Sequence, residues 1–534
     1  MSARPRPAPR ARRSSLAPVP DDVPHAHPFV SPRRLGALVF VAGGGTLATE
    51  IAASRLLAPY FGSSTAVWAN IIGLILVYLS VGYWLGGRVA DRRPEPRLLA
   101  WIVLVAAAFV AATPFAARPL LDAALHGFAS LSIGAVVGSF FAALALFAIP
   151  VTLLGAVSPF AVRLALADVR EAGRVAGRLY ALSTVGSILG TFVSALVAVE
   201  LVGTRRTMVG TAVLLALAAL PLAGRRGVPV ALALAALLLL PAGSVKHVSG
   251  LLYETESPYQ YVQVVRRGDG SRALQLNEGV AVHSLWRPGT VFTGGYWDLF
   301  LLLPRLLDHP ARRLLVIGNA GGTVARAYGR VYPHVAVDGV EIDPAVTEAG
   351  RRFLGLGDNP RLHVVTADGR TFLRLTHRRY DLVIVDAYRQ PYVPFHLATA
   401  EFFALARRHL EPGGIVALNV AAVPGDRRLT RALGTTLRSQ LPQAWTWPAL
   451  RFNDVLLGLD RPATRTELLR RAARADGRVA RLVPLFASRL ALVHATGRVL
   501  TDDRAPVEWL TDAMIVHQLA RGGGLDDAPL PTLP

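Results

Sequence analysis

Residues whose types suit a nucleoside ligand follow several apolar, β-rich runs in the second half of this 534-residue chain. The first is the loop Gly318–Thr323, which comes after LLVI and opens a helical pattern. Glycines, here including Gly318 and Gly321, let a backbone approach a ligand closely, and a helix N-terminus favours polar or anionic groups. Glu341 comes about twenty residues later, where an acid would hydrogen-bond a ribose. The loop alone is equally compatible with a structural turn.

Two further carboxylates follow the next runs of the same pattern. Asp368 and Gly369 come after RLHVVTA, where they would meet an adenine edge, and Asp386 comes after YDLVIV. The ligand of an open α/β sheet binds beyond the carboxyl ends of its strands, so we expect these residues to lie together. Asp343 precedes Pro344 and has the position of a helix N-cap. Taken together, the strand ends predict a pocket for an adenosyl sulfonium compound.

The segments around these residues predict the elements that position them. From Arg312 onward, strands are expected at LLVIG, VAVDGVEID, RLHVVTADG, YDLVIVDA and GGIVALNV, and helices from about Gly322, from Pro344 and over 399–410. This alternation predicts a Rossmann-like, doubly wound and mostly parallel α/β sheet over 313–534, of the S-adenosylmethionine-dependent methyltransferase type. Residues 246–312 contain YQYVQVVRR and ALQLN around a Gly-Asp-Gly turn, which predicts a small β-rich subdomain before it.

The composition of the whole chain excludes an ordinary water-soluble enzyme. Apolar residues make up 52% and charged residues 17%, against a usual charged share of about 25%, and the mean hydropathy is +0.40. The chain has no cysteine, so neither a disulfide nor a thiolate metal site is expected. The net charge of +21 is spread along the chain, and all basic residues but Lys246 are arginines. We therefore expect no nucleic-acid partner and no metal.

Residues 35–245 carry the apolar excess and predict a multi-pass transmembrane helical domain. About seven hydrophobic segments lie near 36–58, 66–87, 98–117, 131–157, 179–203, 207–223 and 228–245. Most approach the roughly 20 residues that a helix needs to cross a bilayer. The loops 88–97 and 163–178 each hold four arginines, which places the N-terminal end in the cytoplasm. Residues 1–34 form a basic tail, rich in Pro and Ala, that we expect to be disordered.

The number of crossings decides on which side the C-terminal domain lies. Seven crossings would place that domain outside, and an even number would keep it inside; the sequence leaves this open. We expect the cytoplasmic side, because adenosyl sulfonium compounds are made there. Within the first segment, Glu50 and Arg55 have two interpretations: a structural pair near the interface, or a substrate or ion site.

The motifs resemble one family closely. The stretch from about Tyr253 to Val420 is similar to spermidine synthases and related polyamine aminopropyltransferases, through SPYQYVQV, VIGNAGGT, VEIDP, TADGR, YDLVIVDAY and LEPGGIVALNV. LATEIAASRLLAPYFGSS and LTDDRAPVEWL are typical of the bacterial branch in which this domain follows a multi-helix membrane segment. The resemblance implies a transferase that moves an aminopropyl group from decarboxylated S-adenosylmethionine, its co-substrate, to a putrescine-type amine.

The same resemblance implies roles for individual residues. Gln260 and Glu341 would hold the nucleoside, with Glu341 on the ribose. Asp386 would be the catalytic carboxylate, which orients and deprotonates the attacking amine, and Tyr296 would line the amine channel. Asp368 and Gly369 would frame the adenine. The resemblance implies no metal and no tightly bound cofactor, and it is compatible with a homodimer formed through this domain.

Two positions differ from the family and keep other functions open. The glycine loop reads Asn319-Ala320 where the family has an aspartate for the donor's ammonium group, and Arg389 stands where the family has a second aspartate for the amine. A methyltransferase that uses S-adenosylmethionine is therefore one alternative. The other is a membrane transporter or receptor whose C-terminal domain binds a nucleoside or polyamine without catalysis.

Overall fold

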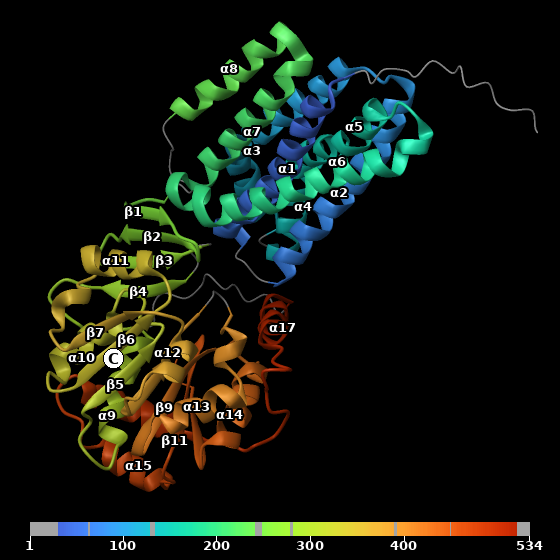
Figure 1. Ribbon diagram of the computed structural model, residues 1–534. Helices are drawn as coiled ribbons and strands as arrows, with labels where there is room; N and C mark the ends of the chain where they lie inside the picture. The colour runs from blue at the N-terminus through green and yellow to red at the C-terminus, as the bar shows by residue number, and fades with distance from the viewer. Residues whose placement is uncertain are drawn as a thin grey trace, which may run out of the picture.

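The computed structural model describes residues 30–61, 65–128, 134–240, 248–277, 281–388, 392–448 and 450–520. They form a helical bundle, a small antiparallel sheet and an α/β domain, in that order along the chain (Figure 1). The predicted tail lies mostly outside the described residues, and so does Arg389.

The bundle consists of long apolar helices packed side by side. Its helices are α1 (Pro32–Phe61), α2 (Thr65–Arg92), α3 (Pro96–Phe128), α4 (Gly134–Gly155), α5 (Val157–Ala165), α6 (Ala172–Val193), α7 (Val199–Ala223) and α8 (Val228–Ala236). Glycines allow α1 and α6 to approach closely: a Cβ on Gly186 would lie 2.0 Å from the Phe40 carbonyl oxygen, and one on Gly190 would lie 2.2 Å from that of Gly44. Such small-residue contacts are typical of helix pairs in membranes.

Six helices of the described chain are long and apolar enough to span a membrane. The last of them, Leu201–Leu239, includes most of α7 and all of α8. It therefore combines two predicted segments, 207–223 and 228–245, into one span. These two helices are separated by a turn at Gly224–Gly227, which Gly224 begins with a positive φ of 67°. Because α8 is only nine residues long, the number of true crossings stays a prediction.

The two ends of the bundle differ in charge and in what they contact. The near end meets the small sheet: Arg55 of α1 donates to the Ser257 carbonyl at 2.7 Å, and Thr204 of α7 to Glu256. The far end holds the α7–α8 turn and the loops after α2 and α5 (Figure 1). There Arg163, near the end of α5, pairs with Asp91, near the end of α2. The arginines of the far end are Arg33, Arg34, Arg88, Arg92, Arg93, Arg97, Arg163, Arg170, Arg174, Arg178, Arg225 and Arg226. The near end has Arg55, Arg118, Arg205 and Arg206.

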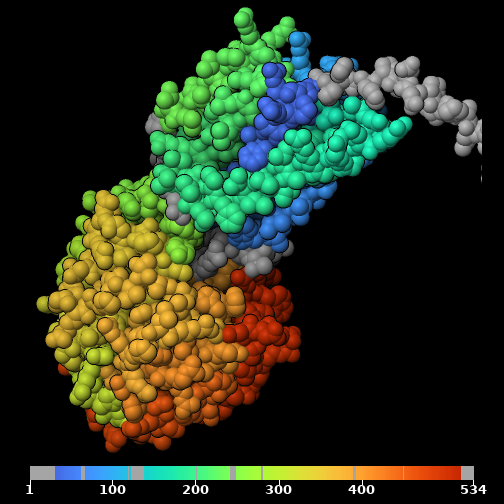
Figure 2. Space-filling model, viewed as in Figure 1, coloured from blue at the N-terminus to red at the C-terminus, as the bar shows by residue number. Residues whose placement is uncertain are grey.

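The small sheet joins the bundle to the α/β domain. Its strands β1 (Leu251–Glu256), β2 (Tyr261–Arg266), β3 (Arg272–Leu276) and β4 (Val282–Trp286) pair antiparallel in sequence order. This is the β-rich subdomain that the sequence predicts. In the space-filling view the bundle and the α/β domain are two lobes that meet over these strands (Figure 2).

The α/β domain has one eight-stranded sheet in the order β12-β10-β11-β9-β8-β5-β6-β7. Its strands are β5 (Arg313–Ile317), β6 (Ala336–Glu341), β7 (Leu362–Thr366), β8 (Tyr380–Val385), β9 (Leu410–Ala421), β10 (Gln443–Trp447), β11 (Asn453–Leu459) and β12 (Ala491–Leu492). The five strands from β7 to β9 are parallel, and β11 runs antiparallel to both neighbours. This order, with its sequence-distant β8 beside β5, confirms the predicted Rossmann-like, methyltransferase-type fold.

Helices cover both faces of this sheet, as the alternation of its buried residues requires. Leu314 and Val316 face the layer of α9 (Leu303–Leu306), α10 (Thr323–Val331), α15 (Arg465–Ala472) and α16 (Val483–Arg489). Leu315 and Ile317 face the layer of α12 (Gly369–Leu375), α13 (Ala400–Arg408), α14 (Arg428–Gln440) and α17 (Val507–Ala520). The helix α11 (Pro344–Phe353) packs on the small sheet and so joins this sheet to the α/β domain.

Candidate active site

Four of the predicted site positions lie at the carboxyl edge of the sheet. Gly318, Glu341, Asp368 and Asp386 stand at or just beyond the ends of β5, β6, β7 and β8, which are neighbours in the order β8-β5-β6-β7. Adjacent strands are about 4.8 Å apart, so the backbones at Asp386 and Glu341 are roughly 10 Å apart across β5. A nucleoside has about this length. The structure therefore brings together the carboxylates that the sequence singles out.

At two of its glycines, the glycine loop packs too tightly against its neighbours for a side chain. Gly318 has a φ of 83°, and a Cβ there would lie 2.6 Å from Ala387 Cα, directly after Asp386. A Cβ on Gly321 would lie 2.3 Å from the Leu354 side chain, and the Gly321 N–H donates to Ser284 Oγ at 2.8 Å. These glycines hold the turn between β5 and α10 against both the end of β8 and the small sheet. These contacts give the glycines a structural role in the turn. A role of the loop in ligand binding stays a prediction.

Glu341 is buried and held by backbone N–H groups. Its Oε2 accepts from Ala320 N at 2.9 Å, in the glycine loop, and its Oε1 accepts from Asp343 N at 3.1 Å. Burial raises the pKa of this carboxyl to about 7, although these hydrogen bonds oppose the rise. The described chain places no cation in a salt bridge with Glu341. A hydroxyl pair or a positively charged ligand would stabilise its charged form.

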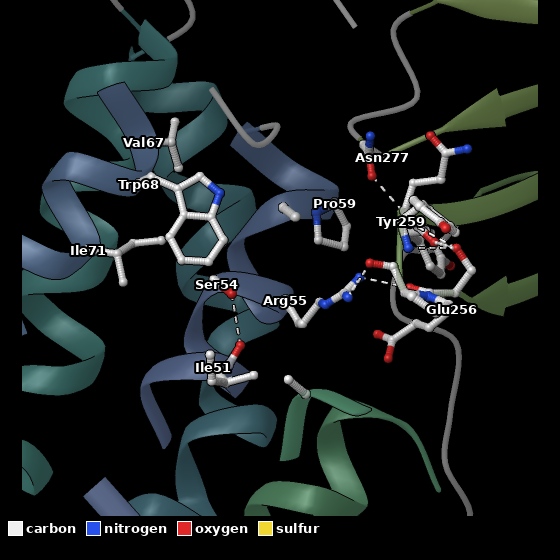
Figure 3. Close-up of a pocket in the computed structure, with 16 residues that line it drawn as sticks. Ile51, Ser54, Arg55, Pro59, Val67, Trp68, Ile71, Glu256, Tyr259 and Asn277 are labelled. Atoms are coloured by element: carbon white, nitrogen blue, oxygen red, sulfur yellow. Dashed lines mark hydrogen bonds between the residues drawn. The ribbon is translucent and has the colours of Figure 1, made fainter. Parts of the chain in front are cut away.

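Gln260 lies in a turn that contacts the same region. The turn Ser257–Gln260 is closed by Ser257 N donating to the Gln260 carbonyl at 3.0 Å. Ser257 Oγ donates to Asp343 Oδ2 at 2.6 Å, and Asp343, fully buried, also caps α11 by accepting from Ala345 N. Asp343 is therefore the N-cap that the sequence suggests and also a tie to the turn. Gln260 and Arg55 line one cavity of about 190 Å³ between this turn and α1 (Figure 3).

Asp386 is bound on both oxygens by neutral donors. The Tyr296 hydroxyl donates to Oδ2 at 3.1 Å, and Asn419 Nδ2 donates to Oδ1 at 2.8 Å. Burial raises the pKa of Asp386 to about 7, and the two hydrogen bonds moderate the rise. Burial and the nearby Asp386 charge raise the pKa of Tyr296 well above its usual value, so its hydroxyl remains a donor. A carboxylate with these properties accepts a proton near neutral pH.

Asp368 and Gly369 begin α12. The Asp368 carboxylate accepts from Thr371 N at 2.8 Å and pairs with His396 Nε2 at 3.0 Å. Burial alone would raise the pKa of Asp368, but the bonds from Thr371 and His396 outweigh it and lower the pKa. A Cβ on Gly369 would lie 2.2 Å from Ile317 Cγ2, so only glycine fits beneath the end of β5. Their role toward adenine stays a prediction.

The structure adds residues that sequence reasoning missed. Asn419 binds Asp386 and also accepts from Asn453 Nδ2 at 3.0 Å. It is a polar residue at the end of the apolar run GGIVAL, which is the pattern that identified the other strand ends. Asn319, which the sequence already marks as a departure from the family, is buried in the glycine loop, and neither of its side-chain polar atoms has a partner among the described residues. Ser257 begins the SPYQYVQV motif, but it does not follow an apolar run, so that pattern does not identify it.

The described residues contain no group of three His, Asp or Glu side chains arranged to bind a metal ion. The side chains described at the carboxyl edge are carboxylates, amides, the Tyr296 phenol and the His396 imidazole, beside the glycine backbone.

Known families match this part of the chain. Residues 296–440 match the family model described as the spermine/spermidine synthase domain. A probable polyamine aminopropyl transferase of Bifidobacterium longum is 37% identical over 193 residues, which are 36% of this chain and 42% of that protein. The polyamine aminopropyltransferase of Vibrio vulnificus is 33% identical over 123 residues, 22% of this chain and 41% of that one. The C-terminal half contains a spermine/spermidine synthase domain.

For brevity, we call residues 248–520, which include the matched residues 296–440, the synthase domain. The chain spans less than half the length of these two relatives. Among solved structures, a probable spermidine synthase from Corynebacterium glutamicum has a TM-score of 0.37 at 17% identity, over 50% of this chain and 94% of that one. A spermidine synthase in complex with the transition-state analogue AdoDATO has a TM-score of 0.35 at 18% identity, over 41% and 76%.

Proposed function

We propose that the synthase domain transfers an aminopropyl group from decarboxylated S-adenosylmethionine to an amine of the putrescine type. The amine nitrogen attacks the carbon beside the sulfonium, the carbon–sulfur bond breaks, and 5′-methylthioadenosine leaves with the bonding electrons on its sulfur. The amine loses one proton, and Asp386 is the base that takes it. The sulfonium is a good leaving group because it becomes a neutral thioether.

The observation that carries this proposal is the environment of Asp386. A protonated amine has no lone pair for attack, so the site needs a group that attracts the cation and then removes its proton. Asp386 combines a raised pKa of about 7 with two neutral donors that keep its oxygens in place, Tyr296 and Asn419. The match of residues 296–440 to the synthase family supports the same assignment.

The nucleoside would lie along the strand ends beside Asp386. We assign the ribose to Glu341 and the adenine to Asp368 and Gly369, as the family resemblance implies. Gln260 belongs to the turn that Ser257 ties to Asp343, and we assign it to the nucleoside only because the family resemblance implies it. Tyr296 would line the amine channel beside Asp386.

A methyltransferase that uses S-adenosylmethionine itself is the second candidate, and Asn319 favours it. This buried amide replaces the acid that the family has in the loop, and its polar atoms have no partner in the described protein. An amide N–H can bind the carboxylate of that donor, whereas an aspartate would repel it.

The experiment supplies each labelled donor, with a panel of amines, to the full chain purified in detergent. Aminopropyl transfer predicts that only the decarboxylated donor is consumed, with one methylthioadenosine formed for each new amine. Consumption of S-adenosylmethionine would support the second candidate. If neither donor is consumed while polyamine flux in liposomes requires Glu50, the chain is a transporter or receptor and both enzymatic proposals are wrong.

For the compartment, we propose that the synthase domain lies on the non-cytoplasmic side of the membrane. Arginine-rich loops face the cytoplasm, and among the described residues the far end of the bundle has twelve arginines against four at the end that carries the synthase domain. This departs from the cytoplasmic position expected from the donor's origin. We rely on the arginine distribution because it is a feature of this chain, whereas the cytoplasmic position was inferred only from where the donor is made. A site on the outer side would require the donor to be supplied across the membrane.

Cysteine labelling tests this side independently of activity, because the chain has no native cysteine. Leu375 in the synthase domain is 74% exposed, and Val169 at the far end of the bundle is 81% exposed. A membrane-impermeant maleimide should label the variant L375C in intact cells, and V169C only after lysis. The reverse pattern would place the synthase domain in the cytoplasm.

A further inference from the structure

A hydrogen-bonded chain connects the first apolar helix to the proposed nucleoside site. Arg55 of α1 donates through Nη1 to the Ser257 carbonyl at 2.7 Å and through Nη2 to the Pro258 carbonyl. Both bonds are made by one guanidinium, whose planar fork suits two acceptors at once. Figure 3 shows Arg55 extending from α1 across to this turn. The two contacts join residues about two hundred positions apart.

The turn that Arg55 holds is also held from the other side. Ser257 Oγ accepts from Tyr259 N at 3.1 Å and from Gln260 N at 3.0 Å, and it donates to Asp343. One hydroxyl therefore fixes the shape of the turn and ties it to the α/β domain. Tilting the turn changes the position of Gln260 and the bond to Asp343 together.

The last links lead to the ribose carboxylate. Asp343 N donates to Glu341 Oε1, and Glu341 Oε2 accepts from Ala320 N in the glycine loop. Asp343 and Glu341 are 0% and 7% exposed, so neither can replace a lost partner with bulk water without a rearrangement. The path from Arg55 to the glycine loop is thus continuous, through Ser257, Asp343 and Glu341.

We propose that Arg55 is a positioning residue for the nucleoside site, so that the membrane helix α1 and nucleoside affinity are coupled. The inference rests on the proposed nucleoside site, and not on the identity of the transferred group. Coupling is reciprocal, so a nucleoside bound in the synthase domain also stabilises the contact between α1 and the turn. The membrane bundle then takes part in ligand binding as well as in anchoring.

A second contact at the same junction provides a matched control. Glu256 accepts from Thr204 N at 3.1 Å and from Thr204 Oγ1 at 2.8 Å, which ties β1 to α7. Glu256 is the residue before Ser257, but its side chain joins the two lobes through α7 and not through the hydrogen bond to Asp343. The exposed Arg178, at the far end of the bundle, controls for the loss of an arginine as such.

The test measures the affinity of the full chain, in detergent, for 5′-methylthioadenosine, because binding of this nucleoside needs no turnover. R55Q removes the guanidinium that makes both bonds to the turn and should weaken binding roughly tenfold, an effect comparable to one charge-assisted hydrogen bond. R55K, which keeps one donor, should recover part of the affinity, and E256Q and R178Q should bind as the parent chain does. Thermal unfolding of all four variants separates loss of affinity from loss of folding.

A double-mutant cycle with S257A decides whether Arg55 acts through the turn. If it does, R55Q has little further effect in the S257A background. Strictly additive losses, or a loss in E256Q equal to that in R55Q, would overturn the coupling and leave a general docking contact. If the parent chain does not bind the nucleoside, the proposed site itself is wrong, which is a different outcome.

Discussion

Carboxylates at the two edges of the same parallel sheet have different partners. Toward the amino edge, Asp381 accepts from Arg312 N, Arg313 N and His309, and Asp338 is bound by Arg378 and Tyr380. At the carboxyl edge, Glu341 and Asp386 are held by backbone N–H groups, a phenol and an amide, with no arginine among these donors.

Within the same two strands, the acids toward the amino edge therefore have the bonds of structural residues, and those at the carboxyl edge have the properties of reactive groups. Asp381 and Asp386 are the first acid of β8 and the residue that follows its end, and Asp338 and Glu341 are both in β6. Burial without a cation raises the pKa of Asp386 and of Glu341 to about 7, where a carboxyl group can exchange its proton with a substrate. Each acid at the carboxyl edge thus has a control on its own strand.

The largest expected effect comes from replacing Asp386, directly after β8, and comparing it with the same replacement of Asp381 within β8. D386N should lower kcat by roughly 10²–10⁴-fold, because it removes the proposed base and keeps its size. D381N should leave kcat nearly unchanged and lower the free energy of unfolding by about 1–3 kcal/mol, because three donors lose their charged acceptor. Steady-state kinetics and thermal unfolding measure both. Equal kinetic losses in the two variants would remove the distinction between the edges.

The acids of β6 should show a smaller effect, confined to nucleoside binding. E341Q should weaken methylthioadenosine binding roughly 10–100-fold, the value of charge-assisted hydrogen bonds to the ribose. D338N should bind the nucleoside normally, because Arg378 and Tyr380 hold that side chain away from the carboxyl edge. Isothermal titration calorimetry gives both affinities. Normal binding by E341Q would exclude this carboxylate as the ribose ligand.

The smallest expected effect is a change in the pH profile. Asp386 must be deprotonated to act, so kcat should fall as the pH drops below about 7. The Tyr296 hydrogen bond favours the charged carboxylate, so Y296F should move this acid limb to higher pH: a several-fold loss at pH 6 and little at pH 9. Y332F, which loses a hydroxyl bonded to the Leu301 carbonyl, is the control. An unmoved limb in Y296F would mean that Asp386 does not set the profile.

Local patterns in the sequence sufficed for much of the fold and for the strand ends of the site. Apolar, β-rich runs that alternate with helical patterns located β5 to β9, and the residue at the end of each run located Gly318, Glu341 and Asp386. These features depend on neighbours in the chain, which is why a sequence shows them. The small sheet was recognisable for the same reason.

Contacts between distant segments could not be predicted in this way. Nothing near Arg55 indicates that it binds Ser257, and nothing near Asn419 indicates that it binds Asp386, because each partner depends on how whole elements pack. The end of the bundle at which the C-terminal domain lies could not be predicted either. It depends on the course of the chain through α7 and α8. The sequence left the parity of crossings open for this reason.

The central claim is that the acids at the carboxyl edge surround one nucleoside-bearing sulfur compound. A structure of the full chain in a lipid nanodisc with 5′-methylthioadenosine tests it most directly. The account predicts the ribose hydroxyls within hydrogen-bond distance of Glu341 and the sulfur facing Asp386 and Tyr296. A nucleoside bound elsewhere, such as in the cavity beside Arg55, with Glu341 and Asp386 unchanged, would contradict it.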